Sequence, residues 1–233
     1  MAVLALAACG GGGSKSSSST TLPQGTTPVK LDPADFTTNI DNPYWPMRVG
    51  SHWVYREVEN GEAQRVDVTV TNEMKALEGI EARVVHDRVS RSGATLEDTF
   101  DWYAQDSDGN LWYLGEDTAE YENGKLKTKE GSWAAGVDGA EPGIVVPAHP
   151  KQGQSYREEY YAGHAEDGAE VLSVNSQVQV PFGRFRNAML TRNFSTIEPT
   201  VEEMKLYARG VGPVMELLVS GGPGRTELLS FER

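Results

Sequence analysis

The chain contains one cysteine, Cys9, among 233 residues, so no disulfide can form within it. It also lacks any run of about eighteen apolar residues, the length that a membrane-spanning helix requires. Basic residues are few, with 21 Lys and Arg against 34 Asp and Glu, and the net charge is −13. This balance argues against binding to nucleic acid or to anionic lipid surfaces through charge.

The sequence equally lacks the short motifs that carry common enzyme chemistry. It contains no GxSxG elbow, no phosphate-binding glycine loop, no HExxH and no dinucleotide fingerprint. None of the spacings of a zinc site occurs among its four histidines, His52, His86, His149 and His164. We therefore predict no cofactor, and we favour a binding or structural module over an enzyme.

The N-terminal residues carry the clearest signal that is present. Cys9 follows Leu6-Ala7-Ala8 and precedes Gly10–Gly13, an arrangement that resembles the lipobox of bacterial lipoproteins. The resemblance implies that residues 1–8 are a short signal peptide, without the usual basic residue, and that Cys9 is lipidated. Anchoring by more than one acyl chain is stable. We therefore expect a cell-envelope protein that is attached to the outer side of a membrane through its N-terminal acyl chains.

Composition divides the remainder into a tether and one domain. From Gly10 to Lys30 the chain is mostly Gly, Ser, Thr, Pro and Gln, with too few apolar side chains to offset the entropy of ordering. We predict a disordered tether over residues 9–35, beginning with the acylated cysteine. Residues 36–233 have the size of a single domain, which we expect to be rich in β-strands.

Alternating residues and turn dipeptides predict the fold of that domain. Val66, Val68 and Val70 alternate with polar residues, as in a half-buried strand. Two-residue hairpin turns are predicted at Asn60-Gly61, Ser92-Gly93 and Asn123-Gly124, which supply positive φ angles. Consecutive hairpins indicate an all-β fold, an antiparallel meander of roughly nine to eleven strands curled into a barrel or an open half-barrel. A two-sheet β-sandwich is the alternative.

Helical signals are weak. Only two short segments, Asp32–Phe36 and Asn72–Leu77, begin with a residue that can cap a helix, and we predict short helices there. Asp41–Pro46 differs from both patterns, because its two prolines exclude a central strand. We expect this segment, which includes Tyr44 and Trp45, to pack across one end of the sheet.

Three tryptophans are candidates for stacking on a ligand: Trp45, Trp102 and Trp112. Trp102 and Trp112 flank one predicted turn, where cross-strand aromatic contacts stabilise a hairpin without any ligand. Packing is therefore the simpler explanation for each of them.

One loop has the oxygen spacing of a calcium site. Asp106, Asp108 and Asn110 alternate as in the first half of many calcium loops. The sixth and twelfth positions of an EF-hand are occupied by Leu111 and Asp117 instead of Gly and Glu. Bound calcium stays a hypothesis here, and an ordinary hairpin turn is the alternative.

Carboxylates next to aromatic residues and a histidine allow a hydrolase hypothesis. His164 is followed by Glu166 and Asp167, and Glu116 follows Trp112-Tyr113. Sugar hydrolysis would need two of these acids facing one cleft, about 5 to 9.5 Å apart. A solvated hairpin loop around His164 is the alternative that we favour.

Several stretches resemble a family of uncharacterised bacterial exported proteins, chiefly Ile40–Pro46, Asp101–Asp106, Gly131–Trp133 with Ala135–Ala140, Ala165–Asp167 and Tyr207–Gly212. The resemblance covers about residues 36–233 and implies no catalytic residue. We expect a non-catalytic β domain that binds a small molecule or a protein, with a carboxylate-dependent hydrolase and a calcium-stabilised interaction domain as alternatives. A cavity of roughly several hundred Å³ lined by Trp, Tyr and Val would favour ligand carriage.

Overall fold

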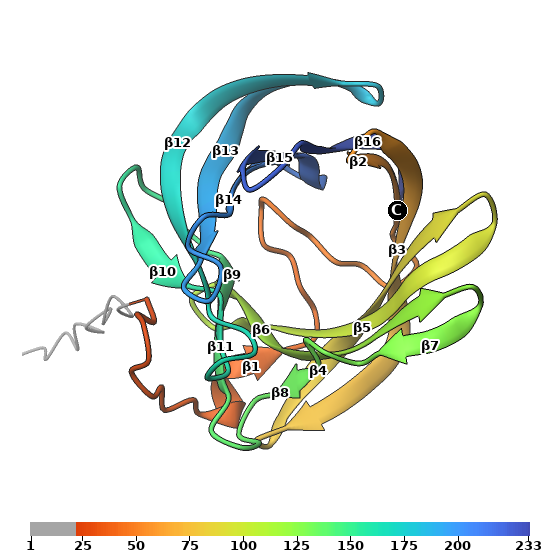
Figure 1. The fold of residues 1–233 in the computed structure, drawn as a ribbon. Helices are drawn as coiled ribbons and strands as arrows, with labels where there is room; N and C mark the ends of the chain where they lie inside the picture. Colours follow the sequence, from red (N-terminus) through yellow and green to blue (C-terminus); the bar gives the residue numbers. More distant parts are fainter. Residues whose placement is uncertain (1–21) are drawn as a thin grey trace, which may run out of the picture.

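The computed structural model describes residues 22–233, and the fold over that range is all-β. Sixteen strands form one antiparallel sheet, which bends round into a nearly closed ring (Figure 1). The predicted meander and its curling into a barrel are confirmed, and the sandwich alternative is excluded. The strands are β1 Phe36–Thr37, β2 His52–Glu59, β3 Glu62–Leu77, β4 Ile80–Arg91, β5 Ala94–Asp106, β6 Leu111–Glu122, β7 Lys125–Thr128, β8 Trp133–Ala134, β9 Glu141–Val146, β10 Ser155–Arg157, β11 Glu159–Tyr160, β12 Asp167–Val180, β13 Gly183–Ser195, β14 Glu202–Ala208, β15 Gly212–Ser220 and β16 Gly224–Glu232.

The hairpin turns follow from local backbone chemistry. Both residues of Asn60-Gly61, Ser92-Gly93 and Asn123-Gly124 have positive φ, as a two-residue hairpin turn requires. Glu78-Gly79 makes the same kind of turn between β3 and β4, with φ of 49° and 83°. The sequence does not predict this fourth turn, because glutamate is not a usual residue at positive φ.

A short stretch of chain connects the two edges of the sheet, because it contributes one strand to each edge. The strand order runs from β10 through β12 to β16, then from β2 through β6 to β9 and β11. Strands β10 and β11 are consecutive in sequence and are separated only by Glu158. The Arg157 guanidinium donates to the Pro142 carbonyl on β9 at 2.8 Å, which ties the two edges together. We call residues 155–160 the seam.

Two expectations about local structure need correction. Residues 72–77 belong to β3 and not to a helix, and the loss of alternation there is a register shift between Val70 and Met74. The helix near Asp32 is a 3-10 turn, Pro33–Asp35, which Asp32 caps by accepting from the Ala34 N–H. The structure has more strands than predicted because several are only two to four residues long, too short to show a period of two.

The described part of the expected tether lies against the domain. The Arg157 side chain donates to the carbonyls of Gly25 and Thr27, both at 2.9 Å, and its N–H donates to the Pro23 carbonyl. Leu22, Val29 and Leu31 pack partly against the core. A free tether over residues 9–35 is therefore incorrect from residue 22 onward. The buried Arg157 side chain satisfies backbone carbonyls of this polar segment and so adds to the packing of its few apolar residues. No helix within residues 22–233 is long and apolar enough to cross a membrane.

Candidate functional site

The segment Asp41–Pro46 enters the ring of strands and packs there, as predicted (Figure 1). The Gln105 side-chain oxygen accepts from the N–H groups of Asp41 and Asn42. The Asn42 amide donates to the carbonyls of Gly109 and Val146, and its oxygen accepts from the Tyr44 N–H. These bonds replace the strand pairing that the prolines prevent, and they hold Tyr44 and Trp45 in place.

Trp45 projects from this segment toward the lumen of the barrel. Its ring lies 5.6 Å from that of Tyr103 and 6.2 Å from that of Tyr207, measured between centroids. A Cβ atom at Gly212 would lie 2.7 Å from the Trp45 ring, and Gly212 has a φ of 119°. Only glycine therefore allows the chain to pass this close to the indole.

The first of two spaces in the lumen, which we call the aromatic chamber, has a volume of about 300 Å³. Trp45, Tyr55 and Tyr103 line it together with valines of β3 and β4. Five carboxylates also reach it: Glu57, Asp87, Glu97, Asp101 and Glu216. Rings and acids meet here because the sheet is curled, so that side chains of β2, β4, β5 and β15 point to one axis.

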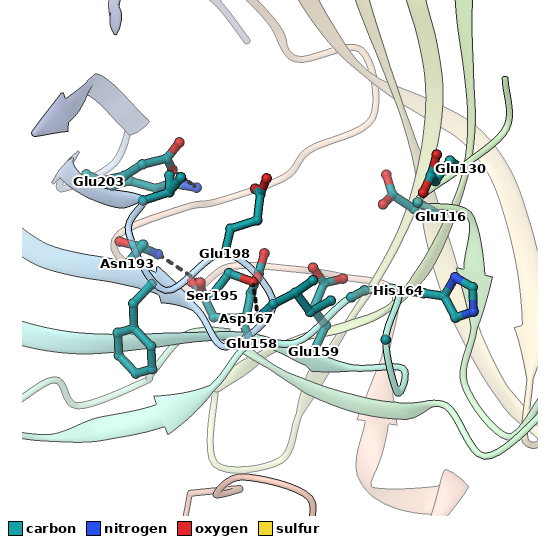
Figure 2. A pocket seen from close by; sticks show the side chains of 17 residues that line it. Glu116, Glu130, Glu158, Glu159, His164, Asp167, Asn193, Ser195, Glu198 and Glu203 are labelled. Carbon is teal, nitrogen blue, oxygen red and sulfur yellow. Dashed lines mark hydrogen bonds and ion pairs between the residues drawn. The ribbon is translucent and has the colours of Figure 1, made fainter. Parts of the chain in front are cut away.

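The second space, the acidic chamber, has a volume of about 370 Å³ and lies against the seam. Figure 2 shows Glu116 and Glu130 on one side of this space and Asn193 and Glu203 on the other, with Glu158, Glu159, Asp167 and Glu198 between them. Glu158 accepts a hydrogen bond of 2.8 Å from the Asn193 amide. Lys205 is the one lysine or arginine among the residues that line the two chambers.

Enclosure raises the pKa values of several of these carboxyl groups. Burial is the largest cause in each case, and it raises the pKa of Asp101 to about 7, of Glu158 to about 7 and of Glu116 to about 8. Burial raises the pKa of Asp87 well above its ordinary value, and the neighbouring Asp101 adds to the effect. The lumen therefore contains acids that titrate close to neutral pH.

Lys205 is the counter-charge to part of this cluster. Its ammonium lies 3.4 Å from a Glu203 oxygen and 3.7 Å from a Glu216 oxygen. Burial disfavours the ammonium, but Glu216 and Glu203 outweigh it and hold the pKa of Lys205 well above its usual value. Burial raises the pKa of Glu216 to about 7 despite this partner.

The structure places three of the four residues proposed for hydrolysis around the acidic chamber and the fourth, Glu166, apart from it. Asp167 and Glu116 line the acidic chamber, and His164 lies at its edge on an exposed turn, stacked on Tyr161 at 4.5 Å. Glu166 is engaged in loop structure, because it accepts from the Gly163 N–H and from the Thr196 hydroxyl. The hydrogen bond from Thr196 and that from Gly163 lower the pKa of Glu166.

In the proposed calcium loop, Asp106 and Asn110 hold the turn together. Asp106 accepts from the Asn110 N–H, the Asn110 amide and the Trp112 indole, each at 2.8 Å. The Asn110 oxygen accepts from the Ala148 N–H, while Asp108 lies at the exposed tip of the turn. No group of three His, Cys, Asp or Glu within residues 22–233 is placed to hold a metal. The turn is explained by internal hydrogen bonds, and calcium stays a prediction that melting with calcium and with a chelator tests.

The remaining candidates also have definite places. Trp112 is buried and contacts Phe36 edge to face at 6.0 Å. The Lys75 ammonium lies over the Trp102 ring at 5.1 Å. Neither of these two rings lines a chamber, so Trp45 is the one predicted stacking residue that does. Cys9 lies outside the described residues.

The acids of the aromatic chamber are not among the site residues that the sequence predicts. On β5, Glu97, Asp101 and Tyr103 point inward, while Phe100 and Trp102 lie on the other face. The signal was available as a period of two over residues 97–103. This pattern does not show which face of the strand is enclosed. An alternating strand usually turns its apolar face toward the interior, but here the face that carries the acids is enclosed.

No protein-family model and no curated protein matches the chain. Among solved structures, it is similar to a candidate exported protein with a YmcC-like fold from Bacteroides fragilis, at 13% identity and a TM-score of 0.49 over 82% of this chain and 99% of that one. It is also similar to a candidate lipoprotein from Parabacteroides distasonis, at 11% identity and a TM-score of 0.45, with 82% and 99% covered. At these values neither likeness indicates what this chain binds or does.

Proposed function

We propose that this protein is a lipid-anchored protein of the cell envelope whose barrel carries a small ligand in its lumen without catalysis. The observation that carries the proposal is the aromatic chamber of about 300 Å³, lined by Trp45, Tyr55, Tyr103 and valines. Ligand sites are concave, largely apolar, and contain a few convergent polar groups. The chamber is concave, and convergent acids interrupt its aromatic and valine walls.

The envelope location is supported by the lipobox-like residues at Cys9. We expect Cys9→Ser to move the protein from the membrane fraction to the soluble fraction almost completely, because the variant has no thiol to acylate. Fractionation of the bacterial host followed by immunoblotting measures the shift. Ser14→Ala, a change in the same segment, is the control and should stay with the membrane. A Cys9→Ser protein that remains in the membrane fraction would contradict the anchor.

Ligand carriage is tested by filling the chamber. N-phenyl-1-naphthylamine, a neutral dye that fluoresces in apolar surroundings, should bind the natural protein in the lumen. Val68, whose side chain lines the chamber, is replaced by Phe to occupy that space. We expect Val68→Phe to weaken dye binding at least about tenfold, because overpacking costs about 1–3 kcal/mol.

The matched control for this experiment is Val219→Phe, since Val219 is 49% exposed and does not line the chamber. It should bind the dye as the natural protein does. Thermal melting of both variants confirms that they fold. Equal dye binding by the two variants, or no binding by the natural protein, would argue against a ligand in this chamber.

A second candidate function is carboxylate-dependent hydrolysis in the acidic chamber. It is favoured by Glu159, whose pKa burial raises well above its usual value, with further contributions from Asp167 and Glu116. An acid that keeps its proton beside other carboxylates is the arrangement that general acid catalysis uses. Turnover of nitrophenyl glycosides that Glu159→Gln abolishes would support it. If the protein binds a ligand but does not hydrolyse the glycosides, ligand carriage stands and the hydrolase hypothesis is rejected.

A further inference from the structure

The aromatic chamber has an unusual balance of charge. Of the fifteen residues that line it, five are Asp or Glu and none is Lys, Arg or His. The three aromatic rings, from Trp45, Tyr55 and Tyr103, belong to three separate segments of the chain. Faces of aromatic rings carry partial negative charge, so rings and carboxylates favour the same kind of guest.

Asp87 is the residue that points most directly to a ligand. Its Oδ1 atom is shielded from solvent and has no hydrogen-bond partner within residues 22–233. Its strand neighbours across the sheet are Val68 on β3 and Thr99 on β5, and the side chain reaches the chamber. Native proteins rarely leave an enclosed carboxyl oxygen without a partner, and each such group calls for a specific explanation.

Asp101 is the carboxyl that adjoins it from the next strand. It accepts a hydrogen bond of 2.7 Å from the Tyr113 hydroxyl. This leaves acceptor capacity, because an ionised carboxylate has about four lone-pair sites. Two adjacent carboxyl groups with unused acceptors and three rings together form a site for a guest that is both cationic and apolar.

We propose that the aromatic chamber binds an organic ammonium ion, with the charge facing Asp87 and Asp101 and the carbon substituents facing Trp45, Tyr55 and Tyr103. This inference rests on the proposed function, because it names the class of ligand that the lumen carries. A metal ion is disfavoured by the valine and aromatic walls, since metals in protein sites need a shell of closely placed oxygen, nitrogen or sulfur ligands. An anion is disfavoured by the five acids.

Binding of a cation should be linked to proton release. Burial raises the pKa of Asp101 to about 7, so part of this group is protonated at neutral pH, and an arriving cation favours the charged form. The groups on the surrounding strands whose charges or hydrogen bonds shift the pKa of Asp101 or Asp87 are Glu57, His86, Glu97, Tyr113 and Glu216. We expect affinity to rise as the pH is raised from 6 to 8.

The test uses a matched pair of probes at pH 8. Choline carries a trimethylammonium group, and 3,3-dimethylbutan-1-ol is its neutral carbon analogue of nearly the same shape. Titration calorimetry should show choline binding about thirtyfold or more tightly, since a desolvated cation on aromatic rings gains about 2 kcal/mol. Equal or tighter binding of the alcohol would overturn the proposal.

The dye experiment separates the two proposals. If N-phenyl-1-naphthylamine binds in the lumen and choline does not, the cation site is disproved while ligand carriage stands. If neither binds, both proposals fail. If choline binds and competes with the dye, both are supported, because the two probes then share the chamber.

A charge-removing variant provides the residue-level test. Asp87→Asn keeps the shape of the side chain and should weaken choline binding about thirtyfold or more. The control is Asp117→Asn, because Asp117 is exposed, pairs with Lys129 and lies on the outer face of β6. Thermal melting reports whether Asp87→Asn has folded. Choline affinity that is unchanged in this variant would show that Asp87 is not part of a cation site.

Discussion

Trp53→Ala is expected to lower the free energy of unfolding by about 3–5 kcal/mol, the usual cost of truncating a buried aromatic residue. Trp53 is fully buried, with 0% of its surface exposed. Its ring stacks on Phe231 at 4.9 Å, and its indole donates to the Val211 carbonyl at 2.8 Å. The residue therefore joins β2, β16 and the turn before β15, which come from opposite ends of the chain.

Trp53→Phe is the matched comparison. It keeps a ring beside Phe231 but loses the indole donor, so it should cost less than half as much as alanine. Val49→Ala, at a position 53% exposed, should change stability by less than about 0.5 kcal/mol. Urea unfolding followed by tryptophan fluorescence and by circular dichroism measures all three. A Trp53→Ala loss below about 1 kcal/mol would mean that the two ends of the chain are not joined as described.

Raising the pH from 5 to 8 is expected to lower the free energy of unfolding by about 2–3 kcal/mol. The main contributor is Glu158, which is 8% exposed at the seam. Burial raises its pKa from the ordinary value of 4.5 to about 7, with Lys205 and Asn193 acting in the opposite direction. Enclosing the charged form is unfavourable, so the folded protein prefers the protonated acid.

The sign follows from the number of protons bound. Between about pH 4.5 and 7 the folded protein keeps a proton on Glu158 that the unfolded chain has lost. The stability that the protonated Glu158 provides is therefore fully present below about pH 4.5 and is lost as the pH rises through about 7. Asp101, Glu116 and Glu216 change stability in the same direction, by smaller amounts because they are only half-buried and solvent screens them more than it screens Glu158.

Other groups do not reverse this trend. Burial opposes ionisation of Asp67, but hydrogen bonds from Arg65 and His52 lower its pKa. The stability that Asp67 provides is lost only when the pH falls below about 4, outside the interval considered. The pKa of Lys205 is raised, so its contribution is lost only at alkaline pH above its ordinary value.

The measurement is a set of urea unfolding curves at pH 5, 6, 7 and 8. Glu158→Gln is the test variant, because glutamine keeps an oxygen to accept from Asn193 and does not titrate. It should flatten the pH dependence by about half or more. Glu130→Gln, on an exposed loop, should leave the dependence unchanged. Stability that rises between pH 5 and 8 would contradict the enclosed, protonated state of the lumen acids.

Local features of the fold could be predicted from the sequence because their causes are local. Asn60-Gly61 and Asn123-Gly124 form hairpin turns because glycine and asparagine accept positive φ at little cost. The prolines of Asp41–Pro46 exclude strand pairing wherever that segment lies. The lipobox-like residues around Cys9 are likewise a feature of sequence alone, and the anchor that they predict awaits its test.

The site could not be predicted in the same way. Glu97 and Asp101 are ordinary polar residues of an alternating strand, and nothing near them in sequence shows that their face is enclosed. Enclosure depends on the pairing of β2 with β16 and on the return of the seam to β9, contacts between residues far apart in the chain. A one-residue change of register would have turned every one of these side chains outward.

The sequence by itself determined that this chain forms antiparallel hairpins, where several of them turn, and that the chain is acidic. Closure of the sheet alone decided which carboxyl groups share the lumen with Trp45, Tyr55 and Tyr103. The physical reason is the distance along the chain over which each effect acts. Backbone φ preferences act over two residues. The raised pKa values and the chambers arise only when strands that are distant in sequence exclude solvent together.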